Sequence, residues 1–432
     1  MFRIPTKGTF ARDVSVLASG TALAQICSFL LYPIIGRLYT PEDMALLAVY
    51  TSLFTILQVL STGKYETSIF LAKTETDAAS LVSLVVSLCF SFCIVITIIF
   101  VGCGDIINSI LRVDLGKLLF FVPLSILSIT IFDTYNEWCI RKKYFSKLSL
   151  NKISNSFLVN GGKVGFAYTP LNSYGLIIGD VIGRLLSALV CVFRIWKADR
   201  QDFRGVNVST IREQAVQFSK FPKFQMPSQL LNTLGASVPV LILSSYYDVS
   251  EVGHFSMAIA VMSVPIGVIG RAIRDVSRKK LKDSIGEQMN IYGLFRSLFK
   301  KALIVSTTVA LLFVFFLPWI FSFVLGDQWF QSGVYAQIMT PMFIASFVAT
   351  CVESTNIVAM KLKWAFLWQL LYSVCNIAPI VVGFLLKLPM IPTLILYSSS
   401  LVVCYLVLVL ISRRSSKYLD RLSLDEIKML NY

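Results

Sequence analysis

The chain is dominated by long apolar segments, which restrict the folds that it can adopt. An α-helix needs about 20 predominantly apolar residues to cross the hydrocarbon core of a bilayer. Charged residues make up only 15% of the chain, against roughly 25% in soluble proteins, so a water-soluble globule is excluded. The sequence predicts an all-α membrane protein of about 12 transmembrane helices, at about 14–36, 44–63, 79–101, 118–140, 153–170, 175–196, 224–246, 252–270, 302–324, 335–358, 364–386 and 391–411.

The basic residues predict the orientation of these helices. The loops on one side of the predicted helices, together with both termini, hold 32 lysines and arginines, whereas the loops on the other side hold 4. Cytoplasmic loops of membrane proteins carry the excess of lysine and arginine, so both termini are predicted to be cytoplasmic. The net charge of +15 follows from this asymmetry and indicates contact with anionic membrane lipids. A nucleic-acid partner is not predicted.

A weak internal repeat supports a division into two halves. Pro33 lies within the first apolar segment and is followed by the acidic loop 39–43, while Pro239 lies within the seventh and is followed by the acidic loop 247–251. Two parallel repeats of six helices are typical of transporters that enclose a central cavity. The alternative is that two short acidic loops resemble each other by chance. The predicted parts are an N-terminal lobe at 1–197, a C-terminal lobe at 198–411 and a cytoplasmic amphipathic tail at 412–432.

Several charged residues fall inside or at the ends of apolar segments, where charge is costly and usually functional. Lys163 has no acidic residue three or four positions away and is predicted to line the cavity. Asp180 and Arg184 share one helix face and form either a structural pair or part of a substrate site. Asp133 and Glu353 are candidates for proton- or sodium-coupling carboxylates or for pairing with a cation.

Two further sequence patterns predict contacts of the helices: a charged pair at one helix end and a regular spacing of glycines within another helix. Glu137 precedes Arg141 by four positions and is predicted to pair with it. Gly175, Gly179 and Gly183 are spaced by four residues, which predicts close packing of the sixth helix against a neighbour.

Metal, cofactor and enzyme chemistry are not indicated. The nine cysteines form no CxxC pair and the chain has a single histidine, so neither a disulfide framework nor a zinc site is predicted. Nucleotide-binding P-loops and the HExxH and GxSxG motifs of hydrolases are absent in any suitable context. The sequence therefore predicts a transporter without a cofactor.

Short motifs in order along the chain resemble the polysaccharide-biosynthesis flippases. Members of this bacterial family translocate lipid-linked O-antigen or capsule repeat units and belong to the multidrug/oligosaccharidyl-lipid/polysaccharide exporter superfamily. The resemblance covers about residues 10–385. It rests on Arg37-Leu-Tyr-Thr-Pro-Glu-Asp43, Lys64-Tyr-Glu-Thr-Ser-Ile-Phe-Leu-Ala-Lys73, Trp138 with Arg141 and Phe145, Phe221-Pro222 with Pro227, and Gly326-Asp-Gln-Trp329.

The resemblance implies a substrate and a location. It implies movement of an undecaprenyl-diphosphate-linked oligosaccharide from the inner to the outer leaflet of the bacterial plasma membrane, coupled to an ion. Contacts with polysaccharide polymerase machinery are a further expectation. The family usually has an arginine where this chain has Lys64, which keeps the charge but loses the bidentate fork.

The charge of the implied substrate suggests which residues contact it. Cations are needed to host the diphosphate, and the candidates in the N-terminal lobe are Lys64, Lys163 and Arg184. Arg271 and Arg274 are expected to recruit the headgroup at the cytoplasmic side. Glu66 is expected to orient Lys64 or to exchange partners with it.

Alternative functions make different demands on the sequence. A cation-coupled drug exporter of the same superfamily needs an acidic cavity, and the buried acids leave this alternative open. A membrane-embedded glycosyltransferase or polymerase normally needs a large extracytoplasmic loop, but the longest predicted loop on that side is 102–117. A peptidoglycan-precursor flippase usually has fourteen helices rather than twelve.

Overall fold

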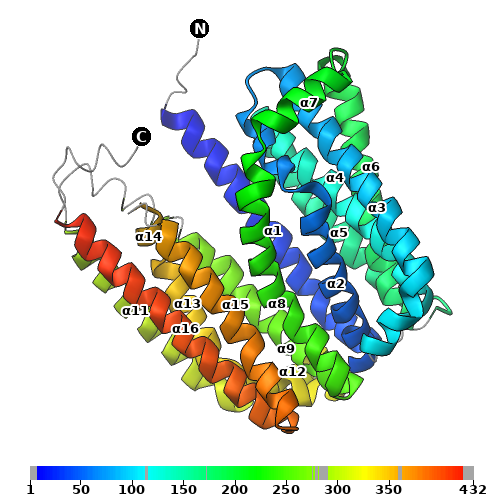
Figure 1. Cartoon of the computed structure of the whole chain (residues 1–432). Helices are drawn as coiled ribbons and strands as arrows, with labels where there is room; N and C mark the ends of the chain where they lie inside the picture. Colours follow the sequence, from blue (N-terminus) through cyan, green and yellow to red (C-terminus); the bar gives the residue numbers. More distant parts are fainter. Residues whose placement is uncertain are drawn as a thin grey trace. The chain divides into compact units, whose positions relative to one another are not determined.

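The computed structural model describes residues 7–111, 115–171, 173–274, 276–277, 281, 290–358 and 362–421. Every regular element within these residues is helical (Figure 1). The first part of the chain contains α1 (Lys7–Leu38), α2 (Pro41–Thr62), η1 (Tyr65–Leu71), α3 (Glu75–Leu111), η2 (Gly116–Phe121), α4 (Val122–Arg141), α5 (Phe145–Ala167), α6 (Ser173–Asp199), η3 (Arg200–Phe203), α7 (Val208–Gln217), η4 (Phe221–Gln225) and α8 (Met226–Tyr246). The second part contains α9 (Val249–Pro265), η5 (Ile266–Gly270), α11 (Ile291–Phe313), η6 (Val314–Phe316), α12 (Leu317–Leu325), η7 (Asp327–Trp329), α13 (Phe330–Val352), α14 (Ser354–Val358), α15 (Leu362–Leu385) and α16 (Met390–Leu419).

Eleven helical stretches in the described residues are long and apolar enough to cross a membrane. They correspond to eleven of the twelve predicted segments, and the all-α membrane fold is confirmed. The one remaining predicted segment, 153–170, corresponds to α5, which is a continuous helix of 23 residues. Its polar side chains, which include Asn155, Asn160 and Lys163, make it less apolar than the others.

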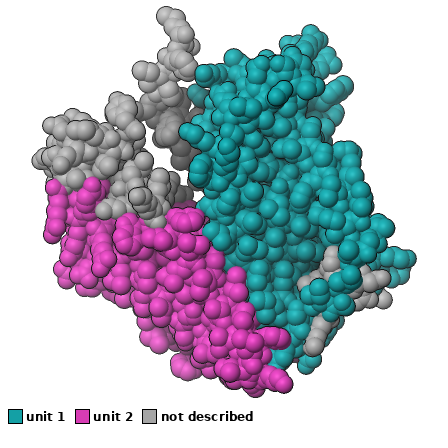
Figure 2. Space-filling model, in the orientation of Figure 1, with its two compact units in different colours: residues 1–253 teal, residues 254–432 magenta. Residues whose placement is uncertain are grey.

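The chain forms two compact units, residues 1–253 and residues 254–432 (Figure 2). The predicted lobe boundary at 197 and 198 is a separate hypothesis about repeat symmetry and stays a prediction. Helix α16 continues to Leu419, so the beginning of the predicted tail is helical. Residues 422–432 of that tail lie outside the described residues.

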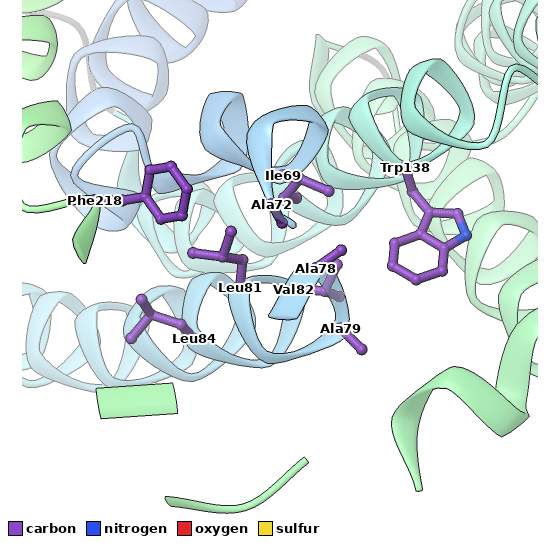
Figure 3. Close-up of a cluster of buried hydrophobic side chains, with 9 residues drawn as sticks. All are labelled: Ile69, Ala72, Ala78, Ala79, Leu81, Val82, Leu84, Trp138 and Phe218. Atoms are coloured by element: carbon purple, nitrogen blue, oxygen red, sulfur yellow. The ribbon is translucent and has the colours of Figure 1, made fainter. Parts of the chain in front are cut away.

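A buried apolar cluster in unit 1 holds the short helix η1 in place. Phe218 and Trp138 lie at opposite ends of the cluster, with smaller side chains between them (Figure 3). The indole Nε1 of Trp138 donates a hydrogen bond to Asp199 Oδ2 at 3.0 Å, which satisfies a polar group that would be costly to bury alone. The cluster thus anchors the segment that follows Lys64. Its members are Ile69, Ala72, Ala78, Ala79, Leu81, Val82, Leu84, Trp138 and Phe218.

Helices α5 and α6 approach each other closely at glycines, as the spacing predicted. A Cβ atom added to Gly179 would lie 2.5 Å from the carbonyl oxygen of Gly162, and one added to Gly183 would meet the backbone of Leu158 and Val159. Small residues at a helix interface allow such backbone contact. This contact positions the α5 residue that follows Gly162, which is Lys163.

We expect Gly179→Ala to destabilise the protein by about 1–3 kcal/mol, the usual cost of overpacking. The new methyl group has only backbone atoms of α5 to displace. Thermal unfolding of the purified protein in detergent measures the effect. The matched control is Gly165→Ala on α5, where an added Cβ has nothing within 4 Å; it should unfold at the wild-type temperature or above it, because alanine favours helix. Equal unfolding temperatures for both variants would contradict the packing argument.

Candidate functional site

Three charged side chains of unit 1 form one connected group, the charged triad Lys163, Asp180 and Arg184. Lys163 Nζ lies 3.0 Å from Asp180 Oδ1, and Arg184 Nε lies 2.5 Å from Asp180 Oδ2. The Asp180 side chain is fully buried, whereas those of Lys163 and Arg184 keep 14% and 18% of their surface exposed. One buried carboxylate therefore holds two cations whose side chains stay partly exposed.

The helices of unit 1 dictate this geometry. Asp180 and Arg184 lie one turn apart on α6, which places both on the same face. Lys163 comes from α5 and lies four residues before its last residue, Ala167. Two contacts brace the triad: the Tyr39 hydroxyl donates to the Lys163 carbonyl oxygen at 2.7 Å, and the Arg184 guanidinium lies 4.9 Å from the Phe54 ring centroid. The triad is thus held by helices α2, α5 and α6 and by Tyr39, which directly follows α1.

Sequence reasoning found the Asp180–Arg184 pair but did not find a partner for Lys163. The search considered only residues three or four positions away on the same helix, and the acid comes from α6. The glycines that bring α5 and α6 together were the available signal, since Gly162 immediately precedes Lys163 and Gly179 immediately precedes Asp180.

A second charged group lies near the start of η1. Lys64 Nζ and Glu66 Oε1 are 3.1 Å apart, and the Glu66 side chain is only 4% exposed. The backbone conformation at this pair is unusual, because Lys64 adopts a left-handed conformation with φ of 63° directly after Gly63. Asp133 and Glu137 of α4 lie within Coulombic range of both members of the pair. We call Glu66, Asp133 and Glu137 the acidic cluster.

The expected pairing of Glu137 with Arg141 is wrong. Arg141 instead contacts Glu75, with Nε 3.4 Å from Oε2, and donates a hydrogen bond to the carbonyl oxygen of Ala72 at 2.5 Å. Lys142 also reaches Glu75, at 2.8 Å. Burial alone lowers the pKa of Lys142, but hydrogen bonds to Asp202 and Glu75 raise it overall. Arg141 and Lys142 therefore pair with Glu75 rather than with Glu137, and Glu137 remains part of the acidic cluster.

The remaining predicted residues belong to unit 2. Arg274 Nη1 lies 2.6 Å from Glu353 Oε1, and both side chains are more than a quarter exposed. Glu353 follows the last residue of α13 and precedes α14, so it lies at a helix break rather than within a helix. Arg271 is exposed. The Arg274–Glu353 contact joins residues distant in sequence and was not predicted.

Metal ligation is not suggested by the described part of the chain. No group of three or more His, Cys, Asp or Glu side chains there could hold a metal ion. The nine cysteines are all free thiols.

The helical fold is shared with two solved structures, a transporter and a flippase. The structure is similar to an inward-facing multidrug resistance MATE family transporter of the MOP superfamily, with a TM-score of 0.70 and 13% identity over 93% of this chain and 99% of the other. It is also similar to the lipid II flippase MurJ in an inward closed conformation, with a TM-score of 0.69 and 14% identity over 90% of this chain and 86% of MurJ.

The family follows from the sequence comparison. A family model described as polysaccharide biosynthesis protein matches residues 34–334, and the chain belongs to this family. The teichuronic acid biosynthesis protein TuaB of Bacillus subtilis (strain 168) is 21% identical over 279 residues, which are 64% of this chain. The match spans 57% of TuaB, little more than half of its length.

Proposed function

We propose that this protein is a flippase for a lipid-linked oligosaccharide. In this proposal it moves an undecaprenyl-diphosphate-linked repeat unit from the cytoplasmic to the periplasmic leaflet of the bacterial plasma membrane. Membership of the polysaccharide biosynthesis family supports the glycan, and the fold shared with MurJ supports movement of a lipid-linked cargo. The observation that carries the proposal is the charged triad, in which one buried carboxylate holds two partly exposed cations.

The triad has the charge that a diphosphate requires. Its formal charge is +1, because Lys163 and Arg184 together outweigh Asp180. Arginine offers a planar fork to phosphate oxygens, whereas lysine acts as a compact point charge. A diphosphate headgroup can bind the exposed parts of Lys163 and Arg184 while Asp180 keeps its contact with both, so no buried charge loses its partner. The two cations then offset the cost of taking the headgroup out of water.

The acidic cluster suggests the coupling step. Glu66, Asp133 and Glu137 concentrate negative charge next to Lys64 and within Coulombic range of one another. Like charges in one site favour uptake of a proton. We propose that proton uptake here accompanies alternating access, and that Lys64 exchanges Glu66 for the substrate phosphate.

The exposed Arg271 and the paired Arg274 are proposed to recruit the headgroup before it reaches the triad. The distribution of basic residues predicts that the loop containing Arg271 and Arg274 lies on the cytoplasmic side, as do both termini. Recruitment from the cytoplasmic leaflet agrees with this prediction. Polysaccharide polymerase machinery is the proposed recipient of the flipped product.

Reconstitution tests the function directly. Purified full-length protein in proteoliposomes should move an undecaprenyl-diphosphate-linked oligosaccharide to the leaflet accessible to a sugar-oxidising reagent. In cells, deletion should leave lipid-linked sugar on the inner leaflet and remove the surface polysaccharide. Movement of cationic dyes without movement of lipid-linked sugar would favour a drug exporter, and elongation of the glycan would favour an enzyme.

A further inference from the structure

A small pocket lies at the start of α15 and near the end of α16 in unit 2. These two helices pack side by side (Figure 1), and the pocket has a volume of about 130 Å³. The described residues that line it are Trp364 of α15 and Ile411, Arg414 and Ser415 of α16. Because the α16 residues are spaced by three and four positions, they share one face of that helix. The pocket therefore combines a cation, a hydroxyl group and an indole.

Arg414 is the cation that this pocket offers to a ligand. Its side chain is exposed, and helix α16 contains no acidic residue that could pair with it along the helix. Asp420, which follows α16, caps α11 instead: its carboxylate accepts hydrogen bonds from the backbone N–H groups of Ile291 at 2.6 Å and Tyr292 at 2.9 Å. Lys417 lies over the Tyr292 ring, 5.1 Å from its centroid. Helix α11 thus engages Lys417 and Asp420, while Arg414 lines the pocket.

The α16 wall of the pocket is held in place by buried polar groups. Asn356 Nδ2 donates a hydrogen bond to Ser412 Oγ at 2.9 Å, and Thr355 Oγ1 donates to the carbonyl oxygen of Ser412 at 3.3 Å. These bonds fix the end of α16 against α14, so Arg414 extends from a fixed segment of helix. Ser415 is only 2% exposed, and its hydroxyl can donate to an acceptor in the pocket that it lines.

Exposed apolar side chains lead from the pocket toward the middle of both helices. On α16, Leu410 and Leu406 are 54% and 52% exposed, and they precede Arg414 by one and two turns. On α15, Leu367 is 52% exposed and follows Trp364 by one turn. All three leucines belong to stretches that are long and apolar enough to cross a membrane. Trp364 and Arg414 therefore lie where the apolar surface ends, at the depth where tryptophan meets the lipid headgroups.

We propose that this pocket binds the phosphate headgroup of an anionic membrane phospholipid, with the acyl chains along the exposed faces of α15 and α16. The tail that follows α16 is predicted to be cytoplasmic, and basic pockets between membrane helices on that side bind anionic headgroups. A volume of about 130 Å³ suits a single phosphate, because pockets for larger ligands enclose about 300–1,000 Å³. The site is independent of the proposed flippase activity, since its ligand is a lipid of the surrounding membrane.

Photolabelling of the full-length protein in nanodiscs tests this site. The probe is phosphatidylglycerol with a diazirine in its acyl chain, titrated into phosphatidylcholine, and adducts are expected on the exposed faces of α15 and α16. Arg414→Gln should raise the probe concentration for half-maximal labelling about tenfold, because a charged hydrogen bond is lost. The matched control is Arg413→Gln, which removes the neighbouring exposed cation that is not among the lining residues. Salt screens such a cation, so its effect should be about twofold or less.

A second probe and two competitors decide which ligand the pocket takes. Phosphatidylcholine with the same diazirine should label wild type and Arg414→Gln equally. A phosphatidylcholine probe that depends on Arg414, or equal effects of the two arginine substitutions in folded protein, would overturn the proposal, because neither fits a site selective for an anionic headgroup. Two further results would also overturn it: displacement of the probe by inorganic phosphate indicates a soluble anion, and displacement by undecaprenyl phosphate at much lower concentration than by phosphatidylglycerol indicates a site for cargo.

Discussion

Asp180→Ala is expected to lower the free energy of unfolding by about 3–5 kcal/mol, the cost of breaking a buried ion pair by removing one partner. The substitution leaves Lys163 and Arg184 facing each other on adjacent helices without the carboxylate between them. Like charges at this spacing repel, and the α5–α6 contact that depends on close glycine packing would open. Thermal unfolding in detergent and the yield of folded protein in membranes measure this loss.

Two further variants separate the charge effect from other causes. Asp248→Ala removes an exposed carboxylate between α8 and α9 and should change stability by no more than about 0.5 kcal/mol. The triple variant with Lys163, Asp180 and Arg184 all replaced by apolar residues of similar volume should recover most of the stability but not the export of glycan. Wild-type unfolding of Asp180→Ala would mean that the triad carries no structural energy.

The fold could be predicted from the sequence because the bilayer fixes the length and apolarity of a spanning helix. Helix α5 is the instructive exception. It reaches spanning length, but its start lies eight residues before the predicted 153, since Lys147 and Lys152 suggested a loop. Lys152 Nζ donates to Thr21 Oγ1 of α1 at 3.0 Å, so the helix keeps its polar face against a neighbour instead of against lipid.

The candidate site could be predicted only where it is local. The Asp180–Arg184 pair follows from the helical repeat, and Lys64 and Glu66 are almost adjacent. The contacts of Lys163 with Asp180 and of Arg274 with Glu353 join different helices, and periodicity within one helix holds no information about them.

Lys163→Ala is expected to keep the fold and lose transport. Asp180 retains Arg184 at 2.5 Å, so no buried charge is left without a partner, and folded protein should reach the membrane in normal amounts. A hydrogen bond to a charged group contributes about 1.5–3 kcal/mol, so loss of the Lys163 contact to a diphosphate should reduce transport about tenfold to a hundredfold. Flipping of a lipid-linked oligosaccharide in proteoliposomes is the measurement.

The control for this variant lies on the same helix. Lys147 is exposed and covers the ring of Tyr144 at 3.8 Å, so Lys147→Ala removes a cation of α5 that the triad does not include, and transport should stay unchanged. Lys163→Arg keeps the charge and should retain much of the activity, although its fork must find new partners beside Asp180. A Lys163→Ala protein that flips at the wild-type rate would remove the triad from the transport pathway, because Arg184 alone is then neutralised by Asp180 and brings no net positive charge to the substrate.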